Sequence, residues 1–225
     1  MKIPRTQLLL FLSIGVFSTS SFAAAVPEKW ISINPKQLAT PQTDMRHEVR
    51  SIYSVEVDGD RNYLHAKYDV IRGKPKKAIH LGRVFGEKQV ALSGVKYLEW
   101  RWRVRQQPSL VDSLKEDPWL DMAVSVYVLI KKPSFIFNGQ GFKFGWLAIK
   151  GPTNTTQRGL RQIQMRTGDL SGLWVEEQVD LCALYEKYYG SCDGEYVEYI
   201  GVMTDADGTK SLAEGDYSDL RVVLK

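Results

Sequence analysis

Residues 94–105, GVKYLEWRWRVR, alternate bulky apolar side chains with charged ones at a period of two. Successive side chains of a β-strand point to opposite faces, so this alternation predicts one strand with a buried face and a solvated face. The buried face comprises Trp100, Trp102 and Val104. The solvated face comprises Arg101, Arg103 and Arg105. This strand constrains the fold more than any other segment, because its tryptophans require an opposing apolar layer.

Other stretches also have strand character. Residues 51–57 and 61–70 predict a hairpin around a Val-Asp-Gly-Asp turn, and residues 120–130 predict a central strand buried on both faces. Further strands are expected at 142–150, 160–167, 173–179, 196–204 and 217–224. Only residues 179–190 have a helical pattern, with Asp180 as the N-cap. We therefore expect a mostly-β chain that forms an antiparallel β-sandwich or jelly roll with one short helix near 180–189.

The first 25 residues have the parts of a secretory signal peptide. Lys2 and Arg5 form a basic start, an apolar stretch follows, and small residues lead to cleavage points after Ala23 or Ala25. The apolar stretch is too short and too interrupted to be a transmembrane anchor. We expect residues 1–25 to be removed, residues 26–225 to form a single β-sandwich domain, and the protein to be periplasmic or secreted.

Cys182 and Cys192 are the two cysteines of the chain. In an oxidising compartment, two cysteines so close in sequence are expected to form a local disulfide. Closing a loop of this size stabilises a fold by roughly 2.5–3 kcal/mol in the chain-entropy account. The alternative is a catalytic thiol, but no histidine lies near either cysteine in the sequence.

Charge and motifs exclude several classes of function. The formal net charge of +4 falls to +2 without Lys2 and Arg5, which argues against a nucleic-acid partner. The three histidines form no zinc-binding spacing, and the chain has neither a nucleophile elbow nor a phosphate-binding loop. Glu176 and Glu177 are adjacent on an expected strand, so they point to opposite faces and cannot act as a catalytic pair. The sequence therefore contains no catalytic constellation, and enzymatic activity stays open.

The segment 203–209, MTDADGT, is the candidate cation site. Asp205, Asp207 and the Thr209 hydroxyl offer oxygen atoms at alternate positions, and Gly208 allows the sharp turn of a calcium loop. Two carboxylates of the following strand are candidate further ligands, namely Asp216 and Asp219. The segment is thus a candidate site for a structural calcium ion, and the alternative is an ordinary Asp-Gly turn whose carboxylates bond their own backbone.

Four blocks of the chain resemble a known family. They are Trp100-Arg101-Trp102-Arg103-Val104, then Asp121 with Ala123 and Val126-Tyr127-Val128, then residues 204–209, and finally Tyr217 with Asp219. In this order they resemble the bacterial domain-of-unknown-function 3047 family, from about Asp58 to the end of the chain. The resemblance implies an exported or envelope-associated jelly-roll protein akin to carbohydrate-binding modules, and it implies no activity. The chain departs from the family pattern at Ser125, where the pattern has an arginine, and in its cysteine pair.

These observations together lead us to expect an exported, non-catalytic β-sandwich protein that binds a glycan, with acidic polysaccharides among the candidate ligands. The expected binding residues are the outward arginines and two tryptophans, namely Arg101, Arg103, Arg105, Trp119 and Trp174. Two other functions stay open: a jelly-roll polysaccharide lyase or hydrolase, and an envelope module whose partner is another protein. A cleft that gathers a histidine and a tyrosine would favour the enzyme, and a flat apolar patch would favour the protein partner.

Overall fold

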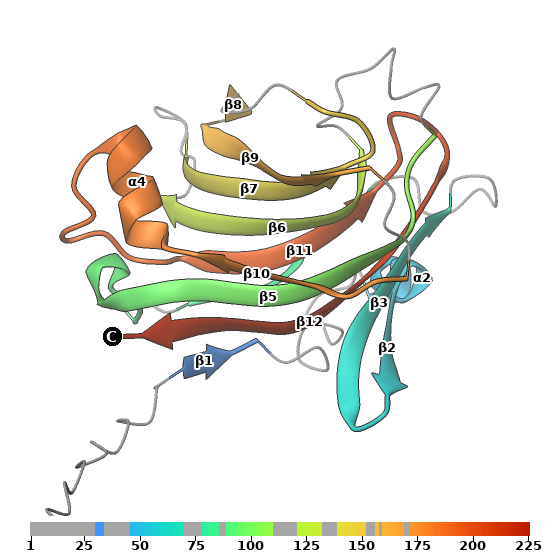
Figure 1. Ribbon diagram of the computed structural model, residues 1–225, viewed down its shortest axis with the longest axis horizontal. Coiled ribbons are helices and arrows are strands. Elements are labelled where there is room, and N and C mark those ends of the chain that lie inside the picture. The colour runs from blue at the N-terminus through green and yellow to red at the C-terminus, as the bar shows by residue number, and fades with distance from the viewer. Residues whose placement is uncertain are drawn as a thin grey trace, which may run out of the picture.

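The computed structural model describes residues 30–33, 46–69, 78–85, 89–109, 121–131, 139–151, 156–157, 159–168 and 172–225. The expected signal peptide and Trp119 lie outside these ranges. Within them the chain forms two β-sheets that pack on each other as a sandwich, and helix α4 lies at one end (Figure 1).

Sheet A has six strands, in the order β10, β5, β12, β3 and β2, with β1 also paired to β12. Their bounds are Val175–Val179 (β10), Val95–Gln106 (β5), Leu212–Leu224 (β12), Arg61–Asp69 (β3), Tyr53–Asp58 (β2) and Trp30–Ser32 (β1). Sheet B also has six strands, in the order β4, β11, β6, β7, β9 and β8. Their bounds are Leu81–Val84 (β4), Tyr199–Asp205 (β11), Met122–Lys131 (β6), Gln140–Leu147 (β7), Leu160–Thr167 (β9) and Thr156–Gln157 (β8). Helix α2 spans Arg46–Ile52, helix α4 spans Leu181–Tyr189, and a single 3₁₀ turn spans Leu92–Gly94.

The mostly-β sandwich expected from the sequence is confirmed, including the β2–β3 hairpin and the central position of β6. Helix α2 and the short strands β1, β4 and β8 were not expected. One pair also departs from the antiparallel rule, because β7 and β9 run parallel. A parallel pair needs a connection of about a dozen residues that returns the chain to its starting edge. Residues 148–159, between β7 and β9, have that length. Their turn-like composition does not predict that the two strands run parallel.

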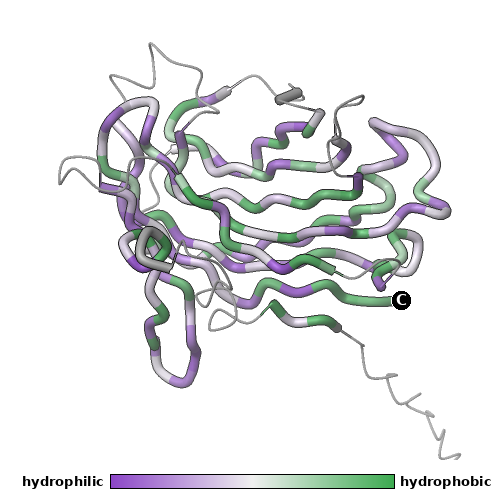
Figure 2. The backbone as a smooth tube through the Cα atoms, turned by 180° about the vertical axis from the view of Figure 1, so that it is seen from behind, coloured by the Kyte–Doolittle hydropathy of each residue, from purple (hydrophilic) through white to green (hydrophobic). Residues whose placement is uncertain are grey.

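The core lies between the inner faces of the two sheets. Trp100 and Trp102 are 1% and 0% exposed, which confirms the predicted buried face of β5. Trp100 packs on Phe144 with ring centroids 5.3 Å apart, and Trp102 packs near Trp146 at 6.0 Å. Hydrophilic and hydrophobic residues alternate along the strands, as this two-faced arrangement requires (Figure 2).

Two local predictions near α4 are confirmed. The Asp180 side chain caps the helix, since its Oδ1 accepts a hydrogen bond from the Ala183 amide at 2.9 Å. Cys182 and Cys192 form a disulfide that joins α4 to the loop after it. Among the residues the structure describes, no helix has the length and hydropathy to cross a membrane.

Replacing Trp100 with alanine is expected to lower the free energy of unfolding by roughly 3–5 kcal/mol, because it opens a cavity against Trp102 and Phe144. Arg101→Gln changes the neighbouring, outward side chain and is expected to cost less than about 1 kcal/mol. Urea denaturation followed by far-UV circular dichroism measures both values. Equal losses in the two variants would contradict the assignment of the two faces of β5.

Candidate functional site

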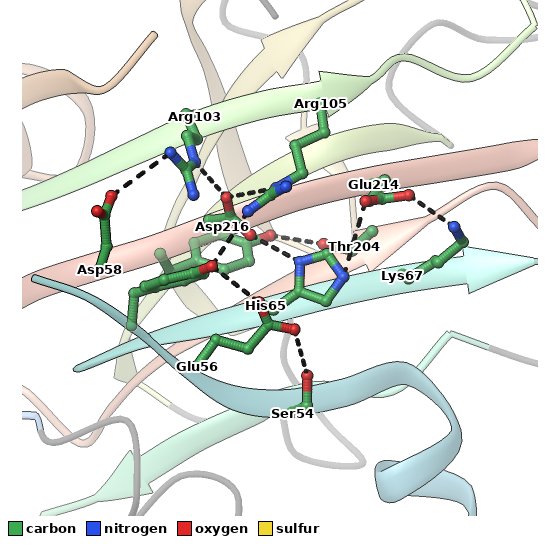
Figure 3. Close-up of polar contacts among 12 residues, drawn as sticks. Ser54, Glu56, Asp58, His65, Lys67, Arg103, Arg105, Thr204, Glu214 and Asp216 are labelled. Atoms are coloured by element: carbon green, nitrogen blue, oxygen red, sulfur yellow. Dashed lines mark hydrogen bonds and ion pairs between the residues drawn. The ribbon is translucent and has the colours of Figure 1, made fainter. Parts of the chain in front are cut away.

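A line of polar residues crosses the outer face of sheet A. Arg103 of β5 lies opposite Asp216 of β12, which lies opposite His65 of β3, which in turn lies opposite Ser54 of β2. Because residues in register share a face, this pairing brings a carboxylate, a guanidinium and an imidazole together from distant parts of the chain (Figure 3).

Asp216 is the centre of this group, and its side chain is 0% exposed. Its Oδ1 accepts a hydrogen bond from His65 Nδ1 at 2.7 Å, and its Oδ2 accepts bonds from Arg105 Nε at 2.8 Å and from Arg103 Nε. Burial alone would raise the pKa of the Asp216 carboxyl, but these three hydrogen bonds outweigh burial and hold the pKa below its usual value. We call these four residues the Asp216 cluster.

Further contacts engage the groups around the Asp216 cluster. The Tyr63 hydroxyl donates to Glu56 Oε2 at 2.8 Å and accepts from Arg105 Nη2 at 3.1 Å. Glu214 lies 3.7 Å from His65 Nε2 and 2.9 Å from Lys67 Nζ. Both ring nitrogens of His65 therefore face carboxylates (Figure 3).

Trp174 lies beside this cluster, in the loop that enters β10. Its ring packs 4.5 Å from the Arg103 guanidinium and 5.6 Å from that of Arg101, and the Tyr63 ring meets it edge-on at 5.7 Å. The loop is fixed to β5 by a backbone hydrogen bond of 2.9 Å from the Gly172 amide to the Val104 carbonyl. Gly172 has φ 84°, a left-handed conformation that a residue without Cβ adopts without strain.

A hollow of about 220 Å³ opens in front of Trp174. Its lining combines one indole, one phenol, two carboxylates, two guanidiniums and one hydroxyl, and consists of Asp58, Asp60, Arg61, Tyr63, Arg101, Trp174 and Ser218. The tight turn of the β2–β3 hairpin places three of these residues at its tip, and Gly59 at φ 63° supplies the left-handed backbone of that turn. We call this space the Trp174 hollow.

The structure brings together three of the five residues expected to bind glycan, because Arg101 and Arg103 both pack on Trp174; of these three, Arg101 and Trp174 line the hollow. Arg103 and Arg105 are hydrogen-bonded to Asp216, and their part in glycan binding stays a prediction. Trp119 lies outside the described residues. The hairpin residues of the hollow were missed, because the sequence predicts that β2 pairs with β3 but not that β12 joins this hairpin to β5.

A second polar cluster lies at the end of β11. Carboxylate oxygens of Asp121, Asp205 and Asp207 all lie within 4.8 Å of one another. Asp121 accepts hydrogen bonds from the Gly208 amide at 3.1 Å and the Thr209 amide at 2.5 Å, and Asp205 accepts one from the Asp207 amide at 3.0 Å. Burial, together with the charges of Asp207 and Asp121, raises the pKa of Asp205 to about 7.

This geometry changes the ligand set that the sequence suggested for calcium. Asp216 belongs to the arginine-rich cluster on the outer face of sheet A, and Asp219 lies between Arg61 and Arg101, so neither joins Asp205. Asp121, which sequence analysis missed, takes their place. The Thr209 hydroxyl shares a hydrogen bond of 2.7 Å with the Ser211 hydroxyl. Calcium binding at this loop stays a prediction.

Comparison with known families supports part of the resemblance seen in the sequence. Residues 153–221 match the family described as "Protein of unknown function (DUF3047)". The matched segment contains Trp174, the 203–209 loop, Asp216 and Asp219, whereas the block around Arg101 precedes it. No curated protein matches the chain. Among solved structures, endoglucanase 3 of Trichoderma harzianum, from family GH12, is similar with a TM-score of 0.38 and 9% identity, over 76% of this chain and 81% of that one.

Removing the Asp216 charge is expected to destabilise the fold. Asp216→Asn removes the counter-charge nearest to Arg103 and Arg105 and should cost about 2–4 kcal/mol at pH 7, less than for a fully buried pair because both arginines retain solvent contact. The folded carboxyl has a lowered pKa, so its stabilising effect is complete above the unfolded value near ~3.9 and is lost as the pH falls through the folded value. Urea denaturation of wild type and variant at pH 7 and at pH 3 measures this. A difference between the two proteins that is just as large at pH 3 would contradict the role of the charge.

If the 203–209 loop binds calcium, chelation is expected to lower the melting temperature, because a ligand of the native state stabilises it by mass action. The effect is about 2.7 kcal/mol when free calcium is about 100 times the dissociation constant. Asp121→Asn should abolish the response, whereas Asp219→Asn, which lies outside the cluster, should retain it. Identical melting curves with and without chelator would show that these carboxylates only accept hydrogen bonds from the backbone of the turn.

Proposed function

We propose that the protein is an exported β-sandwich that binds a glycan in the Trp174 hollow without chemically altering it. The observation that carries this proposal is the composition of the hollow, an indole ring beside two carboxylates and two guanidiniums. A sugar ring has an apolar C–H face that stacks on an aromatic ring, and a rim of hydroxyls that hydrogen-bond to charged, planar groups. The hollow offers both kinds of contact within one space.

The hollow is also rigid where a ligand would contact it. Trp174 rests on Arg103 and Tyr63, and both are fixed in turn by the Asp216 cluster through Arg103 Nε and through Arg105. Side chains held in place before binding lose little conformational entropy when the ligand arrives. This pre-organisation lowers the entropic cost of binding and so supports binding of a sugar through a small contact area.

The charge of the lining bears on the kind of glycan. Two carboxylates and two guanidiniums give the lining no net formal charge. A densely charged polyanion would meet Asp58 and Asp60 as well as the arginines, and would be repelled by them. The hollow therefore suits a sugar recognised mainly through its hydroxyls, with room for an isolated anionic group.

An enzyme is the second candidate, because the structure gathers histidines and tyrosines in two places. In and beside the Asp216 cluster, His65 and Tyr63 are already engaged by carboxylates, and burial together with the hydrogen bond to Glu56 raises the pKa of Tyr63, which opposes its use as a base. On the outer face of sheet B, the His80 ring lies 4.2 Å from that of Tyr127, and Lys143 Nζ lies 5.5 Å from the same ring. Tyr127 and Lys143 are 7% and 3% exposed, so a polymer does not reach them. Binding is the better supported function.

A protein partner is less well supported. The large apolar side chains that the described part of the chain exposes are Val57, Val84 and Leu173. They come from β2, from β4 and from the loop before β10, and isolated exposures of this kind are ordinary on monomeric proteins.

The disulfide supports function outside the cytoplasm. Disulfides form and persist in oxidising compartments, and Cys182 is bonded to Cys192 here. The proposal of a periplasmic or secreted protein rests on this bond and on the leader-like first 25 residues.

Trp174→Ala is expected to weaken glycan binding by roughly 10- to 100-fold, because central aromatic residues dominate small binding sites. Leu173→Ala is the matched control, since it removes an adjacent, 61% exposed side chain that does not line the hollow. The measurement is an array of neutral and acidic oligosaccharides followed by calorimetry on the best ligand, with the chain from residue 26. Binding that survives in Trp174→Ala would place the glycan elsewhere, and release of unsaturated sugar products would establish a lyase.

A further inference from the structure

One carboxylate lies between the two arginines of the Trp174 hollow. Asp219 Oδ2 is 3.7 Å from Arg101 Nη1 and 3.9 Å from Arg61 Nη1. Both separations exceed hydrogen-bonding distance, so the single oxygen is attracted to both guanidiniums but bonded to neither. Arg61 and Asp219 are 58% and 44% exposed at their side chains, which makes these pairs weak.

The backbone at Asp219 is unusual. Its φ is 52°, in the left-handed region that aspartate and asparagine adopt more readily than other residues with a Cβ. The pairing of β12 with β5 shifts register between Ser218 and Arg221, so Asp219 lies in a bulge. Bulges redirect side chains and are common next to functional sites. The bulge thus places the carboxylate next to the arginines.

We infer that Arg61 and Arg101 form an anion subsite of the hollow, which Asp219 occupies loosely in the free protein and which a carboxylate or sulfate group of a bound sugar takes over. This inference rests on the proposed glycan function and assigns its ligand class, a sugar with one anionic group in the hollow. Asp219 acts as an internal stand-in for that group.

The exchange is favourable because the contacts differ in kind. A ligand oxyanion between the arginines accepts direct hydrogen bonds of about 2.7–2.9 Å, which are stronger than ion pairs at longer range. Asp219 loses little when it turns to water, since it accepts no hydrogen bond from either arginine. A neutral sugar cannot displace it, so the stand-in favours anionic ligands over neutral ones of the same shape.

The number of anionic groups is limited by the rest of the lining. Asp58 and Asp60 belong to the same hollow, and a second anion near them would be repelled. Arg103 does not add to the subsite, because Asp216 and Asp58 already take up its charge.

Asp219→Asn tests the inference, since asparagine keeps the shape, tolerates the left-handed backbone and removes the charge. Calorimetry with oligogalacturonate, a 6-sulfated N-acetylglucosamine oligomer and their neutral counterparts is the main measurement. The variant is expected to bind the anionic sugars about 3- to 10-fold more tightly than wild type and the neutral sugars equally well. Asp193→Asn, an exposed and distant change of the same charge, corrects for the general effect of net charge.

Arg61→Gln and Arg101→Gln are each expected to weaken the binding of anionic sugars by a similar factor and to affect the binding of neutral sugars less. Sodium sulfate and sodium acetate provide a readout without glycan, through NMR shifts of the Nε–H groups of Arg61 and Arg101. Those shifts should saturate at lower concentration in Asp219→Asn than in wild type.

The outcomes separate the two proposals. Sugars that bind with no preference for anions, together with no effect of Asp219→Asn, would overturn the subsite and leave glycan binding standing. Sulfate binding that tightens in Asp219→Asn without any sugar binding would support the subsite and overturn the glycan function. A lower melting temperature in Asp219→Asn with unchanged binding of every probe would make Asp219 a structural ion pair and overturn the inference.

Discussion

The buried carboxylate of Asp216 organises the outer face of sheet A. It accepts hydrogen bonds from two arginines of β5 and one histidine of β3, so it links the three strands at the middle of the sheet. Without this negative charge, Arg103 and Arg105 would stand side by side on one strand face and repel each other. Trp174 stacks on Arg103, and Tyr63 bonds to Arg105, so both aromatic walls of the Trp174 hollow depend on the same carboxylate.

The inner face of β5 makes this outer arrangement possible. Trp100 and Trp102 are locked against the aromatic rings of β7, and the Trp102 indole also donates to Glu177 at 3.2 Å. Glu177 in turn pairs with Arg166 of sheet B at 2.7 Å, which ties the edge of one sheet to the other. A strand held so firmly on one side fixes the spacing of the arginines on its other side, and that spacing sets where Trp174 rests.

The sequence was most informative where the interaction is local. The period-two pattern of residues 94–105 gave the two faces of β5, and short separations gave the Asp180 cap and the disulfide. It was least informative where strands distant in sequence meet. Asp216 is 151 residues from His65 and 113 from Arg103, and nothing in the alternation fixes the register that joins them.

That missing register explains why the structure groups the residues of the two candidate sites differently from the sequence analysis. Asp216 and Asp219 follow the 203–209 loop closely in sequence, which suggested shared calcium ligation, yet β12 carries them to the arginines of β5. The loop instead meets Asp121, whose carboxylate lies 87 residues from the Gly208 amide that bonds to it. Proximity in sequence therefore did not predict which groups these carboxylates contact.

The same pairings determine what the outer face of sheet A can recognise. The alternation of arginines made acidic polysaccharides candidate ligands, but hydrogen bonds to Asp216 already engage Arg103 and Arg105. Among the described residues, Asp219 is the carboxylate that pairs with Arg101 and Arg61, at 3.7 and 3.9 Å. Because direct hydrogen bonds to a guanidinium are stronger than pairs at that distance, these two arginines can exchange their partner for a ligand at small cost. The selectivity that we propose for a single anionic group thus follows from which arginines the fold has already engaged with hydrogen bonds.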